Sequence, residues 1–348
     1  MNDIEILNRL IKASGVTGQE REISAVIMEL FSGYSSDVWQ DPYGNVYARM
    51  GQKNEPEIMI MAHMDEIGLM VTDIEKNGLL HFINVGGVDP RVLPGSEVLV
   101  LGTEKIPGII GAVPPHLTHG QTGDAYKMEE LYLDTGLTYE EVTEKIRIGD
   151  YITFAPKDVL ELANGQVSSK TLDDRALVLV MLKMMEELGR YNLKCSVVFC
   201  ASVQEERSGV GAVTGAFRIH PDMAIAIDVH HALTPGVKPY EAYPLDKVVI
   251  TKGSNIHEKL FEMLMKAAAD INVETAVDVD MGNTATDAWD IQVQRGGIPS
   301  AIVSPPLKYM HTSVETIDMK TLENCGKVIL EFLKGIDDDW EEKLCLDD

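Results

Sequence analysis

The chain has 348 residues, of which 45% are hydrophobic, and its 55 Asp and Glu outnumber its 30 Lys and Arg. This length and composition are typical of a globular protein with a large core and two domains. The formal net charge of -25 repels phosphate backbones and anionic lipids, so nucleic acid and membranes are poor candidate partners. The charge favours cations such as metal ions and amines, although a role in solubility explains it equally well.

Targeting signals are not evident in the sequence. No apolar run reaches the length of about 18 residues that crosses a bilayer, and the N-terminus is acidic where a signal peptide is basic and apolar. Cys195, Cys200, Cys325 and Cys345 show neither CxxC spacing nor the density of a disulfide scaffold. We therefore expect a protein of the reducing cytoplasm.

The first part of the chain alternates helical and strand patterns. Apolar residues recur at helical spacing over 3–12 and 18–32. A turn containing Pro and Gly at 41–45 then separates two short predicted strands. The apolar run at 57–62 predicts a buried strand.

The middle of the chain has a different texture. From about residue 67, short β-like runs are separated by Gly, Pro and Asn, which predicts a small β-barrel or sandwich. From about residue 171, helices again alternate with apolar strands. We expect an α/β fold with a mixed, mostly parallel sheet covered by helices, formed by 1–66 and 164–348, and a β-rich insertion at 67–163.

Ionisable residues gather after predicted strands and before one predicted helix. Ligands in an open α/β sheet bind at the carboxyl ends of its strands, so these residues are candidate ligands. They are, in chain order, His63 with Asp65, Asp173 with Asp174, Glu205 with Glu206, Asp228 with His230 and His231, and His311.

Each candidate alone has an ordinary structural explanation. A lone histidine such as His63 is more often hydrogen-bonded than metal-bound, and Asp173 precedes a helix, where a carboxylate caps free N–H groups. Capping and solubility do not, however, account for such residues at five successive positions. Two imidazoles and three carboxylates suit a pair of divalent first-row ions with one bridging carboxylate. A further carboxylate beside them suits metal-assisted hydrolysis.

Several segments resemble one peptidase family. They are AHMDEIG, KTLDDRA, SVQEERSGVGA, AIDV, TDA at 286–288, RGGIPSAIVSPPLKYMHTSVE and, in the insertion, IIGAVPPHL. In order and over nearly the whole chain they are similar to the M42 metallo-aminopeptidases, which include glutamyl aminopeptidase, cellulase M and tetrahedral aminopeptidase. The resemblance implies a zinc-exopeptidase-like domain with a small β-barrel inserted for dimerisation. It also implies a homo-oligomer, commonly a dodecamer built from dimers, that admits only short peptides.

The resemblance also implies a ligand set, carried over residue by residue. His63 and Asp228 would hold one divalent ion, Glu206 and His311 a second, and Asp173 would bridge the two. The ions would be Zn2+ or Co2+, and the sequence does not choose between them because carboxylate and imidazole sites accept several first-row ions.

The remaining roles follow from the same resemblance. Glu205 would be the general base, Asp65 would orient the His63 ring, and the peptide bond from Asp173 to Asp174 would be cis. The loops INVGGVDPR and PPHLTHG would lie at the interface or the pocket.

We therefore expect a cytoplasmic two-metal aminopeptidase that trims short peptides. The alternatives are a metal-dependent deacylase or carboxypeptidase with the same site, and a catalytically silent peptide-binding assembly, against which the intact Glu205 argues. The preferred first residue of the substrate does not follow from the sequence. Histidines without an assigned role are His116, His119, His230 and His231.

Overall fold

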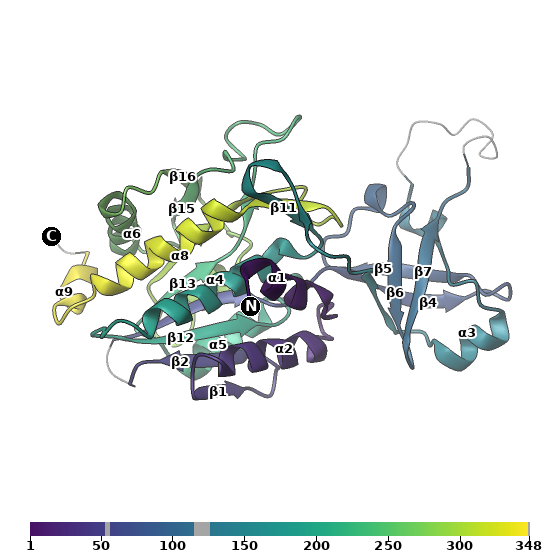
Figure 1. Ribbon diagram of the computed structural model, residues 1–348, viewed down its shortest axis with the longest axis horizontal. Helices are drawn as coiled ribbons and strands as arrows, with labels where there is room; N and C mark the ends of the chain where they lie inside the picture. The colour runs from purple at the N-terminus through teal and green to yellow at the C-terminus, as the bar shows by residue number, and fades with distance from the viewer. Residues whose placement is uncertain (53–55, 115–125, 347–348) are drawn as a thin grey trace.

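The computed structural model describes residues 1–52, 56–114 and 126–346 of the chain. It contains a large sheet covered by helices and, beside it, a smaller β-barrel (Figure 1). Within the described ranges, no helix has both the length and the apolar character that crossing a bilayer requires.

The large sheet has eight strands in the order β1-β2-β12-β3-β13-β17-β15-β16. Their bounds are β1 Asp37–Gln40, β2 Val46–Met50, β12 Ser196–Ser202, β3 Glu57–His63, β13 Met223–Ile227, β17 Ser300–Ser304, β15 Val248–Gly253 and β16 Thr275–Asp280. Strands β12, β3, β13 and β17 pair in parallel, whereas β1, β2 and β15 join through antiparallel pairs. The predicted mixed, mostly parallel sheet is confirmed.

Strand β3 is apolar throughout because both of its faces are covered. Successive side chains of a strand point to opposite faces. Ile58 and Ile60 accordingly pack in the main core, whereas Met59 and Met61 pack in a smaller core on the other face. A strand covered on both faces reads as a continuous apolar run, which is the pattern that predicted it.

Helices cover both faces of the large sheet (Figure 1). The main core takes side chains from α1 Asp3–Lys12, α2 Arg21–Ser32, α4 Leu172–Leu188, α6 Glu258–Asp270 and α8 Met319–Lys334. The smaller core takes side chains from α5 Val210–Ile219 and α7 Asp287–Ile291. Helix α9, Trp340–Leu344, follows near the end of the chain.

The barrel is closed, which decides between the two predicted forms of the insertion. Its strand order is β4-β5-β8-β7-β6-β9. The bounds are β4 Gly68–Ile74, β5 Leu80–Val85, β6 Glu97–Leu101, β7 Lys105–Gly111, β8 Tyr132–Asp134 and β9 Tyr151–Phe154, with α3 Tyr139–Lys145 and the 3-10 helices η1 Pro90–Val92 and η3 Met128–Glu130. The barrel has an apolar core of its own. The limits of the insertion, 67 and 163, stay a prediction.

A second sheet of five strands lies where the barrel joins the large sheet (Figure 1). Its order is β10-β11-β19-β18-β14, with the bounds β10 Leu160–Glu161, β11 Gln166–Ser169, β19 Glu315–Asp318, β18 Pro306–Lys308 and β14 His230–His231, and η4 Ala163–Gly165 precedes β11. The sequence did not predict this sheet. It matters for the site because β11 leads into α4, and β18 and β19 flank His311.

Candidate active site

The predicted site residues meet at one edge of the large sheet. Strands β12, β3 and β13 are parallel neighbours, so their carboxyl ends lie at this edge. His63 ends β3, and Glu205 and Glu206 follow β12. The other members are Asp228 after β13, Asp173 in the first turn of α4, and His311 after β18.

Asp173 lies between the two histidines. Its Oδ1 is 3.1 Å from Nε2 of His63, and its Oδ2 is 3.5 Å from Nε2 of His311. The same Nε2 of His311 is 3.3 Å from Oε2 of Glu206. The carboxylate thus presents one oxygen to each imidazole, as a bridging ligand does.

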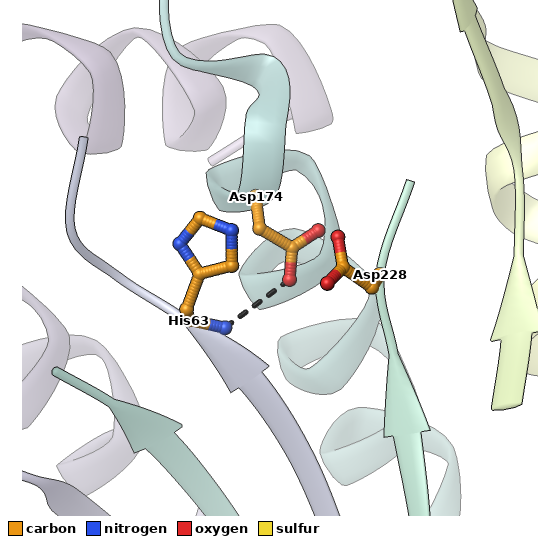
Figure 2. A group of neighbouring side chains, drawn as sticks. All are labelled: His63, Asp174 and Asp228. Atoms are coloured by element: carbon orange, nitrogen blue, oxygen red, sulfur yellow. Dashed lines mark hydrogen bonds between the residues drawn. The ribbon is translucent and has the colours of Figure 1, made fainter. Parts of the chain in front are cut away.

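Asp174 is a further acidic group at the site. His63 forms one group of donor atoms with Asp173 and Glu206, and the atoms of this group lie within 4.8 Å of one another. It forms a second group, within the same limit, with Asp174 and Asp228. Figure 2 shows the side chains of this second group. Oδ2 of Asp174 accepts the main-chain N–H of His63 at 3.2 Å, whereas its Oδ1 is buried and has no hydrogen-bond partner among the described residues. The peptide bond between the two aspartates is cis, as the resemblance implied.

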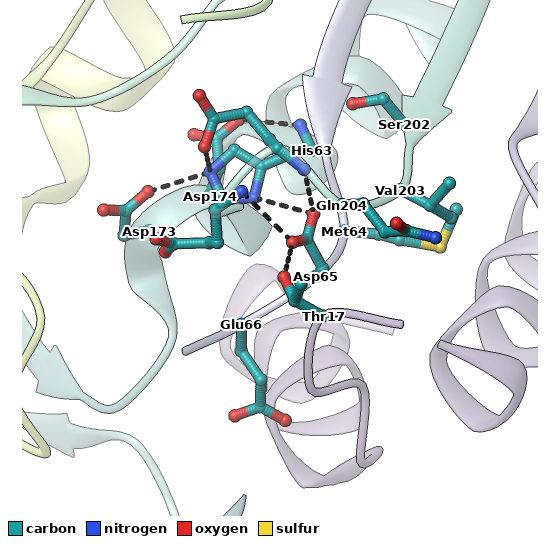
Figure 3. A network of polar contacts seen from close by, with 12 residues as sticks. Thr17, His63, Met64, Asp65, Glu66, Asp173, Asp174, Ser202, Val203 and Gln204 are labelled. Carbon is teal, nitrogen blue, oxygen red and sulfur yellow. Dashed lines mark hydrogen bonds and ion pairs between the residues drawn. The ribbon is translucent and has the colours of Figure 1, made fainter. Parts of the chain in front are cut away.

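Asp65 connects the ring of His63 to the loop after β12 (Figure 3). Its Oδ1 lies 3.5 Å from Nδ1 of His63, which is long for a hydrogen bond. The two oxygens of Asp65 accept the main-chain N–H groups of Glu205 at 3.1 Å and Glu206 at 3.3 Å. The hydroxyl of Thr17 also donates to Asp65. These contacts fix the start of the loop that carries both glutamates.

Glu205 stands apart from both groups of donor atoms. Its side chain is 16% exposed, and its Oε2 lies 4.0 Å from Nε2 of His63. Burial raises the pKa of Glu205 well above its usual value, His63 opposes this rise, and the charges of Asp228 and Asp287 add to it. The carboxyl group therefore lines the cavity close to these donor atoms without belonging to either group.

Two buried carboxyl groups belong to the site although the sequence analysis assigned them no role. Oε2 of Glu315 accepts the N–H of Asp173 at 3.0 Å, and its Oε1 accepts the N–H of His311 at 2.9 Å. Asp287 accepts the hydroxyl of Ser202 at 2.6 Å, and burial raises the pKa of Asp287 to about 6. Both lie inside segments that carry the resemblance, TDA and MHTSVE, and no spacing pattern marks them otherwise.

The donor set fits divalent cations. Burial alone would lower the pKa of His311, but its contacts with Asp173 and Glu206 raise that pKa to about 11. Burial raises the pKa of the carboxyl groups of Asp174, Glu205, Glu206, Asp228 and Glu315. Buried carboxylates are costly without compensating positive charge. Imidazole and carboxylate donors suit first-row divalent ions, which would supply that charge.

A cavity of about 990 Å³ opens over the site. The barrel supplies part of its wall through Gly87, Asp89 and Arg91, which lie in the loop INVGGVDPR and its continuation into η1. This loop was expected at the pocket or the interface. The other such loop, PPHLTHG, lies from residue 115 onward outside the described residues.

Two of the four unassigned histidines line the same cavity. Nε2 of His230 is 3.5 Å from Oδ1 of Asp278, and the His230 ring also packs against Tyr243. Burial lowers the pKa of His231. The other two, His116 and His119, lie outside the part of the chain that the structure describes.

Comparison with known proteins defines the class of enzyme and then the family. The sequence model of the M42 glutamyl aminopeptidase family matches residues 44–328 of the chain. The chain is 33% identical to the lysyl aminopeptidase of Pyrococcus furiosus, over 97% of this chain and 99% of that protein. The chain is therefore a peptide hydrolase. It belongs to the M42 aminopeptidase family.

Solved structures of similar proteins agree with this assignment. A TET aminopeptidase from the marine sediment archaeon Thaumarchaeota archaeon SCGC AB-539-E09 has a TM-score of 0.93 at 28% identity, with 99% of each chain covered. The TET1 peptidase of Pyrococcus horikoshii has a TM-score of 0.84 at 30% identity, with 96% of this chain and all of the other covered. That peptidase can assemble into a tetrahedron or a large octahedral shell.

Proposed function

We propose that the protein is a two-metal aminopeptidase that removes the N-terminal residue from short peptides. The observation that carries the proposal is the placement of Asp173, whose two oxygens lie 3.1 Å and 3.5 Å from the Nε2 atoms of His63 and His311. A single carboxylate between two imidazoles is the arrangement that a bridged pair of ions needs.

The proposed ligands divide into two sets that share Asp173. His63 and Asp228 would hold one ion, and Glu206 and His311 would hold the other. When bound, two divalent ions such as zinc or cobalt supply Lewis-acid polarisation of the scissile carbonyl and lower the pKa of water.

Glu205 is the proposed general base. Its carboxylate takes the proton of the attacking water and passes it to the nitrogen of the departing amine, so one group serves both halves of the reaction. Asp65 holds the main chain of Glu205 through a 3.1 Å hydrogen bond, which keeps the base beside the ligands. Asp65 is therefore a positioning residue in this proposal.

We infer that the chain forms a homo-oligomer through its barrel, in dimers that assemble further into a dodecamer. Exposed apolar side chains on the barrel support this inference, and they are Ile83, Ile109 and Ile148. The tetrahedral assembly of the similar Pyrococcus horikoshii peptidase supports it as well. An assembly that encloses its active sites would restrict substrates to short peptides.

A panel of chromogenic aminoacyl substrates, with N-acetylated controls, tests the proposed activity. We expect cleavage of the free-amine substrates only, its loss on chelation, and its recovery when cobalt or zinc is added back. Release of acetate from the N-acetylated controls, which leaves the chromophore attached, would indicate a deacylase instead. Without metal-dependent cleavage of any free-amine substrate, the silent peptide-binding assembly would be favoured.

A further inference from the structure

His311 is held less firmly by packing than the other proposed histidine ligand. Its side chain is 30% exposed, against 2% for His63. It lies in a turn at φ 61°, a conformation that non-glycine residues seldom adopt. Specific contacts must therefore set the direction of its ring.

The main chain and the ring of His311 contact different parts of the fold. Its main-chain N–H donates to Oε1 of Glu315, at the start of β19, at 2.9 Å. Its ring Nδ1 lies 3.1 Å from the carbonyl oxygen of Gly87, in the barrel segment after β5. A carbonyl only accepts, so Nδ1 must carry the proton. The other nitrogen, Nε2, faces Asp173 and Glu206, and there it would bind an ion that displaces its proton.

The absence of a side chain at Gly87 allows this contact. A Cβ at Gly87 would lie 2.6 Å from Nδ1 and 2.8 Å from Cε1 of His311, closer than real Cβ atoms approach. Gly87 is not among the glycines with positive φ, so its backbone does not call for glycine. The close approach of the His311 ring is the physical reason for glycine here.

We propose that Gly87 is a positioning residue for the ion held by Glu206 and His311. Through this carbonyl the barrel sets the tautomer and the direction of the His311 ring. The insertion thus contributes to ion binding within its own subunit, beyond any part in assembly. This inference rests on the proposed two-metal site.

Substitution of Gly87 by alanine tests the inference, with Gly111→Ala as the matched control. Gly111 lies on β7 of the same barrel and has no positive φ, and none of the described residues comes within 4 Å of a Cβ added there. Metal-free protein is titrated with Co2+ by calorimetry. In Gly87→Ala we expect one of the two binding steps to weaken about 10- to 100-fold. The other step, and the melting temperature of the metal-free protein, should match those of wild type and Gly111→Ala.

Two outcomes would overturn the inference. One is two binding steps of wild-type affinity in Gly87→Ala. The other is the loss of both steps together with a lower melting temperature of the metal-free variant, because that result would indicate a general structural role. If wild type itself binds no ion, or if His311→Ala retains both steps, the two-metal proposal fails and this inference falls with it.

The tautomer of His311 provides a check that needs no substitution at Gly87. In zinc-loaded wild type labelled with 15N-histidine, the ring shifts of His311, assigned by their absence in His311→Gln, should report a protonated Nδ1. A protonated Nε2 with a free Nδ1 would overturn the inference.

Discussion

Glu315 uses each of its carboxylate oxygens on a main-chain N–H group, one from Asp173 and one from His311. These two proposed ligands come from separate elements, α4 and the turn after β18. A single buried carboxyl group therefore sets their main chains relative to each other. Buried N–H groups that lose their acceptor cost free energy, so this residue is open to a direct test.

We expect Glu315→Gln to weaken ion binding about 10- to 100-fold, as loss of such outer contacts typically does. Glutamine offers one acceptor oxygen, and its NH2 group would face the other N–H donor. The free energy of unfolding of the metal-free protein should fall by about 1–3 kcal/mol. Calorimetric titration and urea unfolding measure the two effects, with the exposed Glu341→Gln on α9 as control. Unchanged ion affinity would contradict the assigned role.

The sequence predicted the candidate site well where strand ends determine it. His63 ends β3 and Asp228 directly follows β13, the parallel neighbour of β3, so the sheet alone brings these two residues to the same edge. Glu315 and Gly87 could not be found in this way. Their contacts join segments distant in sequence, and neither a buried acceptor nor a missing Cβ leaves a spacing pattern.

A buried charged cluster ties the elements behind the site together. Lys170, just before α4, donates to Glu66 and, at 3.0 Å, to the hydroxyl of Thr153 on the barrel strand β9. Arg175 of α4 is fully buried and donates to Glu66 at 3.2 Å and to the carbonyl oxygen of Leu10 on α1 at 2.8 Å. Glu66 thus compensates two buried cations at the junction of the barrel and the helices.

We expect Glu66→Gln to lower the free energy of unfolding by about 3–5 kcal/mol, because it removes the carboxylate that forms ion pairs with both buried cations, Lys170 and Arg175. The control is Glu29→Gln, whose partner Arg9 is on the surface and whose own side chain is 70% exposed. Exposed pairs contribute about 0–1 kcal/mol. Urea unfolding at neutral pH compares the two variants, and equal losses would contradict the role of the cluster.

The same cluster predicts a pH dependence of stability. Burial would raise the pKa of Glu66, but the positive charges of Lys170 and Arg175 outweigh it and hold this pKa below its usual value. A lowered folded-state pKa stabilises the protein above the unfolded value, about 4.3, and this contribution is lost as the pH falls through the folded value. The difference in the free energy of unfolding between wild type and Glu66→Gln should therefore become smaller as the pH falls below about 4. A difference that widens below pH of about 4 would contradict this account.

The length of a helix or strand determined whether it could be predicted from the sequence. The helix predicted at 3–12 matches α1, and the one predicted at 18–32 contains α2, because amphipathic patterns of several turns are strong signals. Strands β14 and β18 are too short to show any periodicity. Strand β16 was missed as well, although it alternates apolar and acidic residues in VDVD at 277–280, which is the pattern of a half-buried strand.

The charge of the whole molecule predicts how salt affects its substrates. A net charge of -25 attracts cationic peptides over long range and repels anionic ones. Between about 0.01 M and 1 M salt the Debye length falls from about 30 Å to about 3 Å, which removes this effect. As the salt concentration rises over this range, we expect kcat/KM to fall several-fold for a lysyl substrate and to rise for a glutamyl substrate. An alanyl substrate serves as the neutral control, and an equal response of all three would contradict steering by charge.

The barrel shows what a sequence can and cannot reveal about a whole molecule. Evenly spaced short strands predicted a β-rich insertion, and its closure into a barrel is confirmed. The barrel contributes Gly87 and Arg91 to the wall of the cavity, and this contact depends on how two parts of the molecule with separate apolar cores pack together, which local sequence patterns do not encode.

The role of Glu205 is tested by the rate of peptide hydrolysis of Glu205→Gln, measured together with the metal content of the variant. We expect the variant to bind two ions per chain, as wild type does, and its kcat to fall about 10²- to 10⁴-fold because the proton carrier is lost. Hydrolysis at the wild-type rate with both ions bound would contradict this role.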